Sequence, residues 1–167
     1  MLVVKDAMVL INLTKMSLLQ QSCASFESVL IPDAVYDEVL KGEERYPHEV
    51  HQVRDAIKQK QMRVATIRDK NLIIKANMFN VYRGESAAVA LYWQEGADVL
   101  ATDDDNVRRK RDALKVNVIG TPAIVITLLR NKSIDRNAYM KAVKKLREIG
   151  WFSSTVFDKM LMEMDND

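Results

Sequence analysis

The chain alternates short apolar runs with helical patterns along most of its length. The apolar runs have the length and composition of buried strands, and every gap between them carries residues at helical spacing. We expect strands at residues 1–5, 28–31, 62–67, 98–102 and 116–119. Repeated strand-then-helix units imply parallel strands with helices on both faces. The sequence therefore predicts a three-layer α/β/α fold with a parallel central sheet of about five strands.

The run from Val99 to Asn106 places three carboxylates, Asp103, Asp104 and Asp105, directly after the fourth expected strand. Ligands of open parallel sheets gather at the carboxyl ends of the strands, and hard cations such as Mg²⁺ prefer carboxylate oxygens. This turn is therefore a candidate metal site, with Asp105 expected to cap the next helix. The alternative is an ordinary turn whose acids serve only as caps and helix-dipole partners.

Three other segments present an acid near a strand end or on the helix that follows. Asp6 follows the first strand and precedes an apolar helix. Glu38 lies in a helical pattern over 33–40, and Glu85 opens a helix whose body, 87–93, is apolar all round. This recurrence favours one shared site over several unrelated turns.

The helical pattern alone does not decide which acid of the 33–40 helix faces a cleft. Glu38 falls on one border of the apolar stripe, while Asp33 and Asp37 share the opposite border, so either border can face a cleft or solvent. For Glu85 the alternative is a favourable acid in the first turn of a helix, a contribution of roughly 0.3 to 1 kcal/mol. The apolar run behind Glu85 predicts a buried helix, which favours the site.

Length and composition fit a single cytoplasmic domain over 1–167, with C-terminal helices in 135–167. The 167 residues are 48% hydrophobic and 29% charged, which is the profile of a globular chain long enough to bury a core. The single cysteine, Cys23, fits a reducing compartment, and no apolar stretch is long enough to span a membrane. A net charge of +2 neither requires nor excludes a polyanionic partner.

Other catalytic chemistries have little support. Cys23 has no histidine near it in sequence, and the pair His48 and His51 lacks a third metal ligand. The basic run 108–111 spreads around a helix, so we interpret it mainly as solvated surface. Arg83, at the expected cleft, is the better candidate for a phosphate contact.

Three local features carry structural predictions. Thr121 and Pro122 form a helix start, with the threonine as N-cap and the proline at the first helical position. The charged stretch 41–60 is the least core-like part and is expected to be a surface helical insertion. The helix over 87–93 has no polar face, so we expect a second subunit to cover one side of it in a homodimer.

Short motifs follow one another in order along most of the chain. They are Asp6, residues 31–39, residues 84–90, Thr102-Asp103-Asp104, residues 118–121 and the tail 146–152. Together they resemble the PIN domain, and most closely its prokaryotic branch related to VapC-type toxins. The resemblance implies a Mg²⁺- or Mn²⁺-dependent ribonuclease that acts on single-stranded RNA and forms a homodimer. For a toxin, it also implies a small antitoxin protein as partner.

Carried over by position, the catalytic and metal-binding acids are Asp6, Glu38, Glu85 and Asp104, with Asp103 as a neighbouring candidate ligand. Many members of the family have Ser or Thr two positions after the first acid, where this chain has Met8. Losing a group that supports the metal ligands typically weakens a metal site by about 10- to 100-fold. The departure keeps open an alternative, namely a non-catalytic PIN-like module that binds RNA or a protein.

Overall fold

A computed structural model describes residues 1–165, which form a five-stranded sheet between helices. The strands are β1 (Leu2–Lys5), β2 (Ser28–Pro32), β3 (Arg63–Ala65), β4 (Val99–Ala101) and β5 (Val118–Ile119). They lie in the order β3-β2-β1-β4-β5, and all neighbours pair in parallel. The expected fold class is confirmed, and the third strand is shorter than the predicted 62–67.

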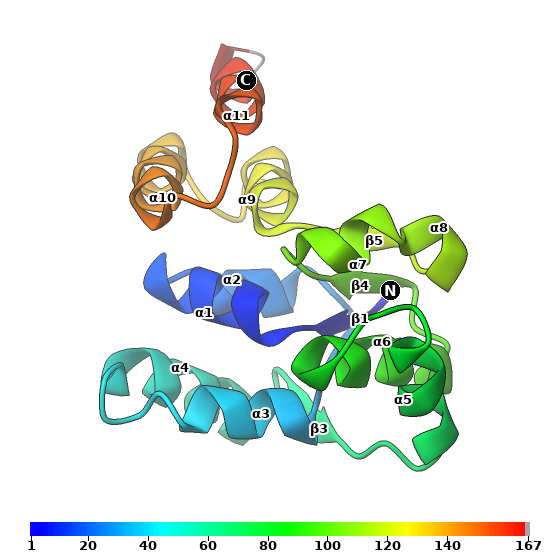
Figure 1. Ribbon diagram of the computed structural model, residues 1–167. Coiled ribbons are helices and arrows are strands. Elements are labelled where there is room, and N and C mark those ends of the chain that lie inside the picture. The colour runs from blue at the N-terminus through cyan, green and yellow to red at the C-terminus, as the bar shows by residue number, and fades with distance from the viewer. Residues whose placement is uncertain (166–167) are drawn as a thin grey trace.

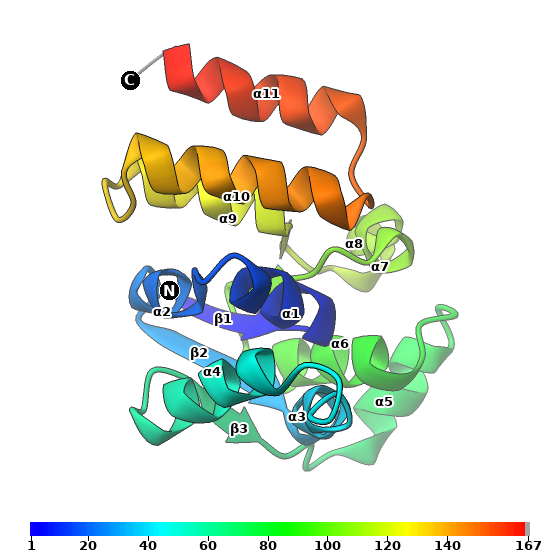
Figure 2. The same cartoon turned by 90° about the vertical axis from the view of Figure 1, so that its left-hand side faces the viewer.

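The helices form two layers. They are α1 (Ala7–Lys15), α2 (Leu19–Ala24), α3 (Asp33–Leu40), α4 (Pro47–Lys58), α5 (Lys70–Asn77), α6 (Arg83–Glu95), α7 (Asp105–Arg109), α8 (Arg111–Leu114), α9 (Thr121–Arg130), α10 (Arg136–Ile149) and α11 (Ser154–Asp165). One layer contains α1 to α4 and α9, and the other contains α5 to α8 (Figure 1). Helices α10 and α11 stack on α9, away from the sheet (Figure 2).

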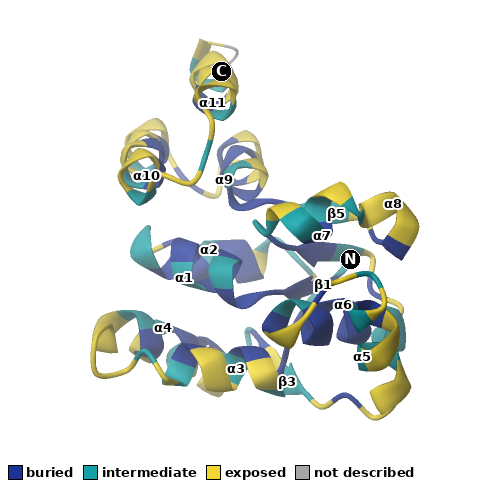
Figure 3. Cartoon of the chain, viewed as in Figure 1, coloured by how far each residue is buried: buried dark blue, intermediate teal, exposed yellow. Residues whose placement is uncertain are grey.

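Successive strand residues contribute to two separate cores. In β1, Val3 packs with the cluster that includes α1, α2 and α9, whereas Val4 packs with the cluster that includes α5 and α6. In β4, Ala101 and Leu100 divide in the same way. A parallel sheet covered on both faces requires apolar side chains on both faces. Accordingly, β1, β2 and β4 are mostly buried and the edge strands β3 and β5 less so, and Figure 3 shows exposed residues mainly on the outer helices.

Helix α4 corrects the expectation for the stretch 41–60. Val50, Val53 and Ala56 are buried in the first core, and α4 packs against α1 and α2. The segment is therefore part of the domain core as well as its surface. Its apolar residues recur every three positions, a helical spacing that the many charges between them obscure.

Two helices begin differently from the prediction. Gly120, and not Thr121, is the N-cap of α9, because the Thr121 hydroxyl donates to a carboxylate of the β4–α7 turn. Asp104, and not Asp105, caps α7, since the Asp104 side chain accepts the Val107 N–H at 2.8 Å. Asp105 is the first residue of the helix.

Helix α6 is enclosed by the chain itself. Residues 86–92 are buried, and the helix packs against α3, α5, β1, β2 and β4. The apolar surface that was expected to need a second subunit is therefore already covered, so this helix gives no reason for a homodimer. Among the described residues, no helix is long and apolar enough to cross a membrane.

Candidate active site

The carboxyl ends of β1 and β4 are neighbours where the strand order reverses. The strands pair with Lys5 opposite Ala101, and the Asp6 N–H donates to the Ala101 carbonyl at 3.0 Å. Asp6 therefore stands beside the turn that carries Asp103 and Asp104. Open parallel sheets form their ligand-binding crevices at such reversals.

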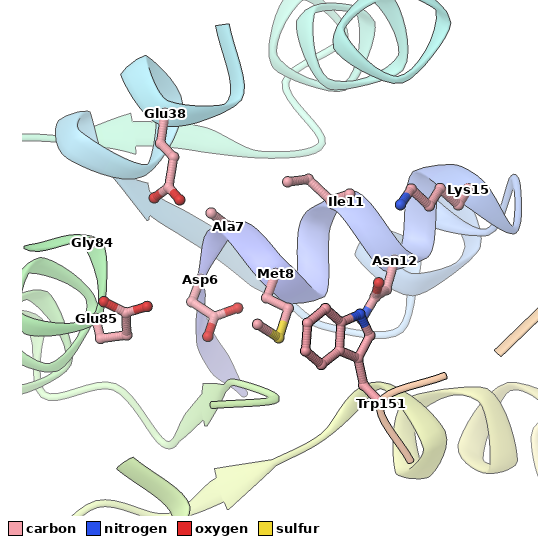
Figure 4. A pocket seen from close by; sticks show the side chains of 10 residues that line it. All are labelled: Asp6, Ala7, Met8, Ile11, Asn12, Lys15, Glu38, Gly84, Glu85 and Trp151. Atoms are coloured by element: carbon pink, nitrogen blue, oxygen red, sulfur yellow. The ribbon is translucent and has the colours of Figure 1, made fainter. Parts of the chain in front are cut away.

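A cavity of about 210 Å³ opens at this edge of the sheet (Figure 4). It is lined by residues of α1, α3, the start of α6 and the loop after α10, namely Asp6, Ala7, Met8, Ile11, Asn12, Lys15, Glu38, Gly84, Glu85 and Trp151. Figure 4 shows the carboxylates of Glu38 and Glu85 turned toward the side on which Asp6 lies. The fold thus brings three of the five predicted acids to one cavity.

Asp6 is buried, with 4% of its surface exposed, and its Oδ1 accepts the Val9 N–H at 2.9 Å to cap α1. Burial raises the pKa of Asp6 to about 7. Hydrogen bonds from Thr102 and Val9 lower this pKa, while the charges of Asp103 and Glu85 raise it. Near neutral pH the carboxyl is therefore close to its midpoint, and a cation beside it would favour the ionised form.

Glu38 is the acid of α3 that reaches this cavity. A Cβ atom on Gly84 would lie 2.7 Å from Glu38 Oε2, so the missing side chain lets the carboxylate lie over the start of α6. A second, larger cavity beside α3 and α6 is lined by Asp37, whereas Glu38 lines both cavities. Of the acids of α3, Glu38 therefore lies in the same cavity as Asp6 and Glu85, a position that the helical pattern left open.

Glu85 lies in the first turn of α6 and is half-buried. Burial is the main cause that raises the pKa of Glu85, and the nearby charges of Asp104 and Glu38 act in the same direction. Glu85 is therefore both an acid in the first turn of a helix and a lining residue of the cavity.

Asp103 and Asp104 have different surroundings. The Asp103 carboxylate accepts the Thr121 backbone N–H at 2.7 Å and the Asn12 amide at 2.9 Å, and it also accepts the Thr121 hydroxyl. These contacts join the turn to α1 and α9. Asp104 uses one oxygen to cap α7, and its charge acts on Glu85. Both acids lie beside the lining of the cavity, Asp103 as a link between elements and Asp104 near Glu85.

The carboxylate oxygens that line the cavity are the type of ligand that a hard cation prefers. Among the ion pairs of residues 1–165, none involves Asp6, Glu38 or Glu85. The charge of Arg83 acts on Glu85 from farther away and lowers its pKa, against the larger effect of burial. As the side chains stand, however, no group of three or more Asp, Glu, His or Cys in the described chain is arranged to hold a metal ion. Glu38 and Glu85, whose side chains are longer than that of Asp6, would have to move closer to Asp6 to share one ion with it.

The polar or aromatic lining residues Trp151, Lys15 and Asn12 were not predicted from the sequence. Trp151 and Lys15 contribute to the cavity from the loop after α10 and from the end of α1, and Asn12 holds Asp103. In the sequence, Trp151 directly follows the helix-ending Gly150 within the tail 146–152, and no pattern there indicated a site role. Placing Lys15 and Asn12 required the tertiary fold.

The predicted basic residues divide between structure and surface. Arg108 donates to the Thr102 carbonyl at 3.4 Å, and Lys110 donates to the Phe79 carbonyl at 2.6 Å, whereas Arg109 and Arg111 are exposed. Arg83 is exposed and lines the second cavity. His48 and His51 are both exposed on α4, as expected for surface residues.

A family model for the PIN domain matches residues 2–166. The chain therefore belongs to the PIN domain family. PIN domains are generally nucleases that bind nucleic acid and use divalent metal ions. No curated protein matches the chain at a significant level.

Proposed function

We propose that this PIN domain is a metal-dependent endoribonuclease that cleaves single-stranded RNA. The observation that carries the proposal is the convergence of Asp6, Glu38 and Glu85 on one cavity at the carboxyl edge of the sheet. The three acids come from three separate elements, and the most deeply buried of them caps a helix directly after the central strand. Turns and caps alone do not require such convergence.

In the proposed site, Asp6, Glu38, Glu85 and Asp104 hold Mg²⁺ or Mn²⁺, and Asp103 supports the turn. When bound, such an ion neutralises charge on the phosphoryl oxygens and makes a water more acidic. The chain supplies the geometry. Capping of α1 fixes the position of the Asp6 carboxylate, and Gly84 leaves room for the carboxylate of Glu38.

The second cavity supports a nucleic-acid substrate. Its two cations, Arg83 and Lys41, lie beside Asp37, and it shares Glu38, Gly84 and Glu85 with the first cavity. Cations at this position attract phosphates of an RNA strand by sequence-independent electrostatics. A strand held there would place a neighbouring phosphate against the acids.

The proposal is tested by incubating mixed single-stranded RNAs with the protein in Mn²⁺, in Mg²⁺ or in EDTA. We expect internal cleavage with either metal, none in EDTA, and none by the variant Asp6→Asn. The matched control is Asp158→Asn, which changes an exposed acid of α11 and should cleave normally. Metal-independent cleavage, or equal cleavage by Asp6→Asn, would contradict the assignment.

A second candidate function is a non-catalytic module that binds RNA. Met8 favours it, since this side chain lines the cavity at the position where the resemblance leads us to expect a hydroxyl group. The side-chain arrangement, in which no group of the described acids holds an ion as it stands, favours it as well. RNA binding without cleavage under every metal condition would select this function.

The biological part of the proposal is a cytoplasmic toxin of the VapC-type branch that forms a homodimer and is restrained by an antitoxin. It rests on the motif resemblance. Expression of the wild-type chain in bacteria should arrest growth, and expression of Asp6→Asn should not. Light scattering of the purified protein at micromolar concentration distinguishes a dimer from a monomer.

A further inference from the structure

We infer that Trp151 is a base-stacking residue of the substrate site, which holds a nucleobase of single-stranded RNA at the mouth of the acid cavity. The inference rests on the proposed function and adds a substrate-positioning residue to it. Trp151 lies in the loop between α10 and α11, and it lines the same cavity as Asp6, Glu38 and Glu85. Figure 4 shows its indole reaching from this loop toward Met8 and Asn12 of α1.

The indole of Trp151 is presented to solvent while the residue after it fixes the loop. Trp151 is 75% exposed. Phe152 is half-buried and packs edge to face on Phe157, with ring centroids 6.5 Å apart. Gly150 ends α10 with φ of +80°, a conformation that turns the chain toward the cavity at little cost for glycine. The loop thus has an anchor, and Trp151 is not needed as one.

The other tryptophan shows what a structural role looks like in this fold. Trp93 is half-buried, donates its indole N–H to the Leu114 carbonyl at 3.0 Å, and has Lys75 Nζ 4.4 Å from its ring centroid. Among the described residues, Trp151 makes neither a hydrogen bond nor a cation–π contact of this kind. Both its face and its N–H are available to a ligand.

The charge of the cavity favours a base as the group that Trp151 holds. Three carboxylates repel the phosphates of a strand, and Lys15 is the only cation among the lining residues of this cavity. Stacking of a base on an aromatic ring carries no net charge, so it supplies affinity where phosphate contacts are disfavoured. Lys15 can meet the phosphate next to the stacked base. Its Nζ also lies 5.5 Å from the Tyr46 ring centroid.

The composition of the cavity favours a nucleic acid over a protein partner. A protein docking site of this size would be expected to surround an exposed tryptophan with apolar residues. Around Trp151 the lining instead places acids, an amide and a lysine among the apolar Ala7, Met8 and Ile11. This is the mixture of aromatic, cationic and catalytic groups that an RNA strand requires.

Fluorescence tests the inference directly. In a Trp93→Phe, Glu85→Gln background with Mg²⁺, Trp151 is the sole tryptophan and cleavage is blocked. We expect a short oligouridylate to quench its emission saturably, and the same ribose-phosphate chain without bases to leave it unchanged. Equal quenching by the chain without bases would overturn the inference.

Affinity of a labelled oligouridylate supplies the second measurement. We expect Trp151→Ala to weaken binding by about 5- to 150-fold, and Trp151→Phe to recover part of the loss. Met162→Ala, at an exposed apolar residue of α11, is the matched control and should bind normally. Suppose that the wild type cleaves RNA with Mn²⁺ while Trp151→Ala binds the oligouridylate as tightly as the wild type does. That result would contradict the stacking inference and leave the nuclease proposal standing. Failure of the wild type both to bind and to cleave would overturn both.

Discussion

Asp6 and Asp104 make the same hydrogen bond in neighbouring units of the sheet. Each carboxylate accepts, through Oδ1, the backbone N–H of the residue three positions later, Val9 at 2.9 Å and Val107 at 2.8 Å. Each therefore caps the helix that follows its strand and keeps its second oxygen for other partners. Capping and metal binding, which the sequence presented as alternatives, are compatible in this geometry.

A divalent cation should stabilise the fold if these acids bind it. Saturation at one hundred times the dissociation constant corresponds to about 2.7 kcal/mol of additional unfolding free energy. Thermal melts with and without Mn²⁺ measure the effect. We expect a higher Tm with Mn²⁺ for the wild type and no increase for the double variant Asp6→Asn, Asp104→Asn. Equal shifts in the two proteins would show that Mn²⁺ binds elsewhere.

Substitution of the three acids of the β4–α7 turn should have three different effects. Asp104→Asn should abolish metal-dependent cleavage with little loss of stability, because asparagine caps helices about as well as aspartate. Asp103→Asn should lower the unfolding free energy by about 1.5 to 3 kcal/mol, since one oxygen that accepts Thr121 or Asn12 becomes a donor. Asp105→Asn should change neither property.

Circular dichroism and urea unfolding of each variant separate ligation from folding. The assignment of roles would be wrong if Asp103→Asn were fully stable. It would also be wrong if Asp104→Asn retained full metal-dependent activity in a protein whose wild type cleaves RNA.

The strand and helix order was predictable because it depends on local periodicity. Each of the five strands begins and ends within two residues of its predicted range, since a buried parallel strand is a continuous apolar run. The caps were less predictable. Whether Thr121 accepts a helix N–H or donates to Asp103 depends on a turn 18 residues earlier in the chain.

The sequence named the candidate acids and predicted that they share one site, but it did not show which of them line the cavity. Asp6 and Asp104 follow strands that pair, so strand order alone brings them to one edge. The helical pattern alone did not distinguish Glu38 from Asp37, and the resemblance selected Glu38; its approach to Gly84 is a contact between distant segments that only the fold shows. The position of Trp151 at the cavity depends in the same way on the tertiary fold, because the loop after α10 brings the chain back to α1.

Gly84→Ala should separate the position of Glu38 from the stability of the fold. The new Cβ would lie 2.7 Å from Glu38 Oε2, so the flexible carboxylate must move away. Replacing a glycine near the start of α6 by alanine adds up to about 1 kcal/mol of helix stability. We therefore expect a protein at least as stable as the wild type, with weaker Mn²⁺ binding and slower cleavage. Unchanged Mn²⁺ affinity by calorimetry would exclude Glu38 as a ligand.

Lys5→Met should remove a pH dependence at alkaline pH. Lys5 is buried, its Nζ donates to Ser22 Oγ at 2.5 Å, and burial lowers its pKa from 10.5 to about 8, against the influence of Cys23. Between these values the unfolded chain binds more protons, so wild-type stability should rise with pH over this range. The variant lacks this rise and should be at least as stable near pH 7. Urea unfolding at pH 7 and at pH 10 measures both effects, and an equal rise in the two proteins would contradict the prediction.

Asp6→Asn should stabilise the metal-free protein increasingly as the pH rises. The pKa of Asp6 is raised from 3.8 to about 7, so between these values the folded chain binds more protons than the unfolded chain. The Asp6 contribution to stability is therefore fully present below pH 3.8 and is lost as the pH rises through about 7. Asparagine keeps the cap of α1 and has no proton to lose. In EDTA, the variant and the wild type should be similar in stability at the acid end, and the variant more stable above neutral pH.

Urea unfolding of both proteins across this pH range measures the difference, and Asp158→Asn, at an exposed acid, should show none. Adding Mn²⁺ above neutral pH should reverse the order, because an ion beside ionised Asp6 stabilises only the wild type. A stability difference between wild type and Asp6→Asn that stays constant with pH would show that the Asp6 carboxyl titrates normally. Burial and the neighbouring acids would then not destabilise the ionised Asp6 carboxylate, which is the charge that the cation is proposed to neutralise.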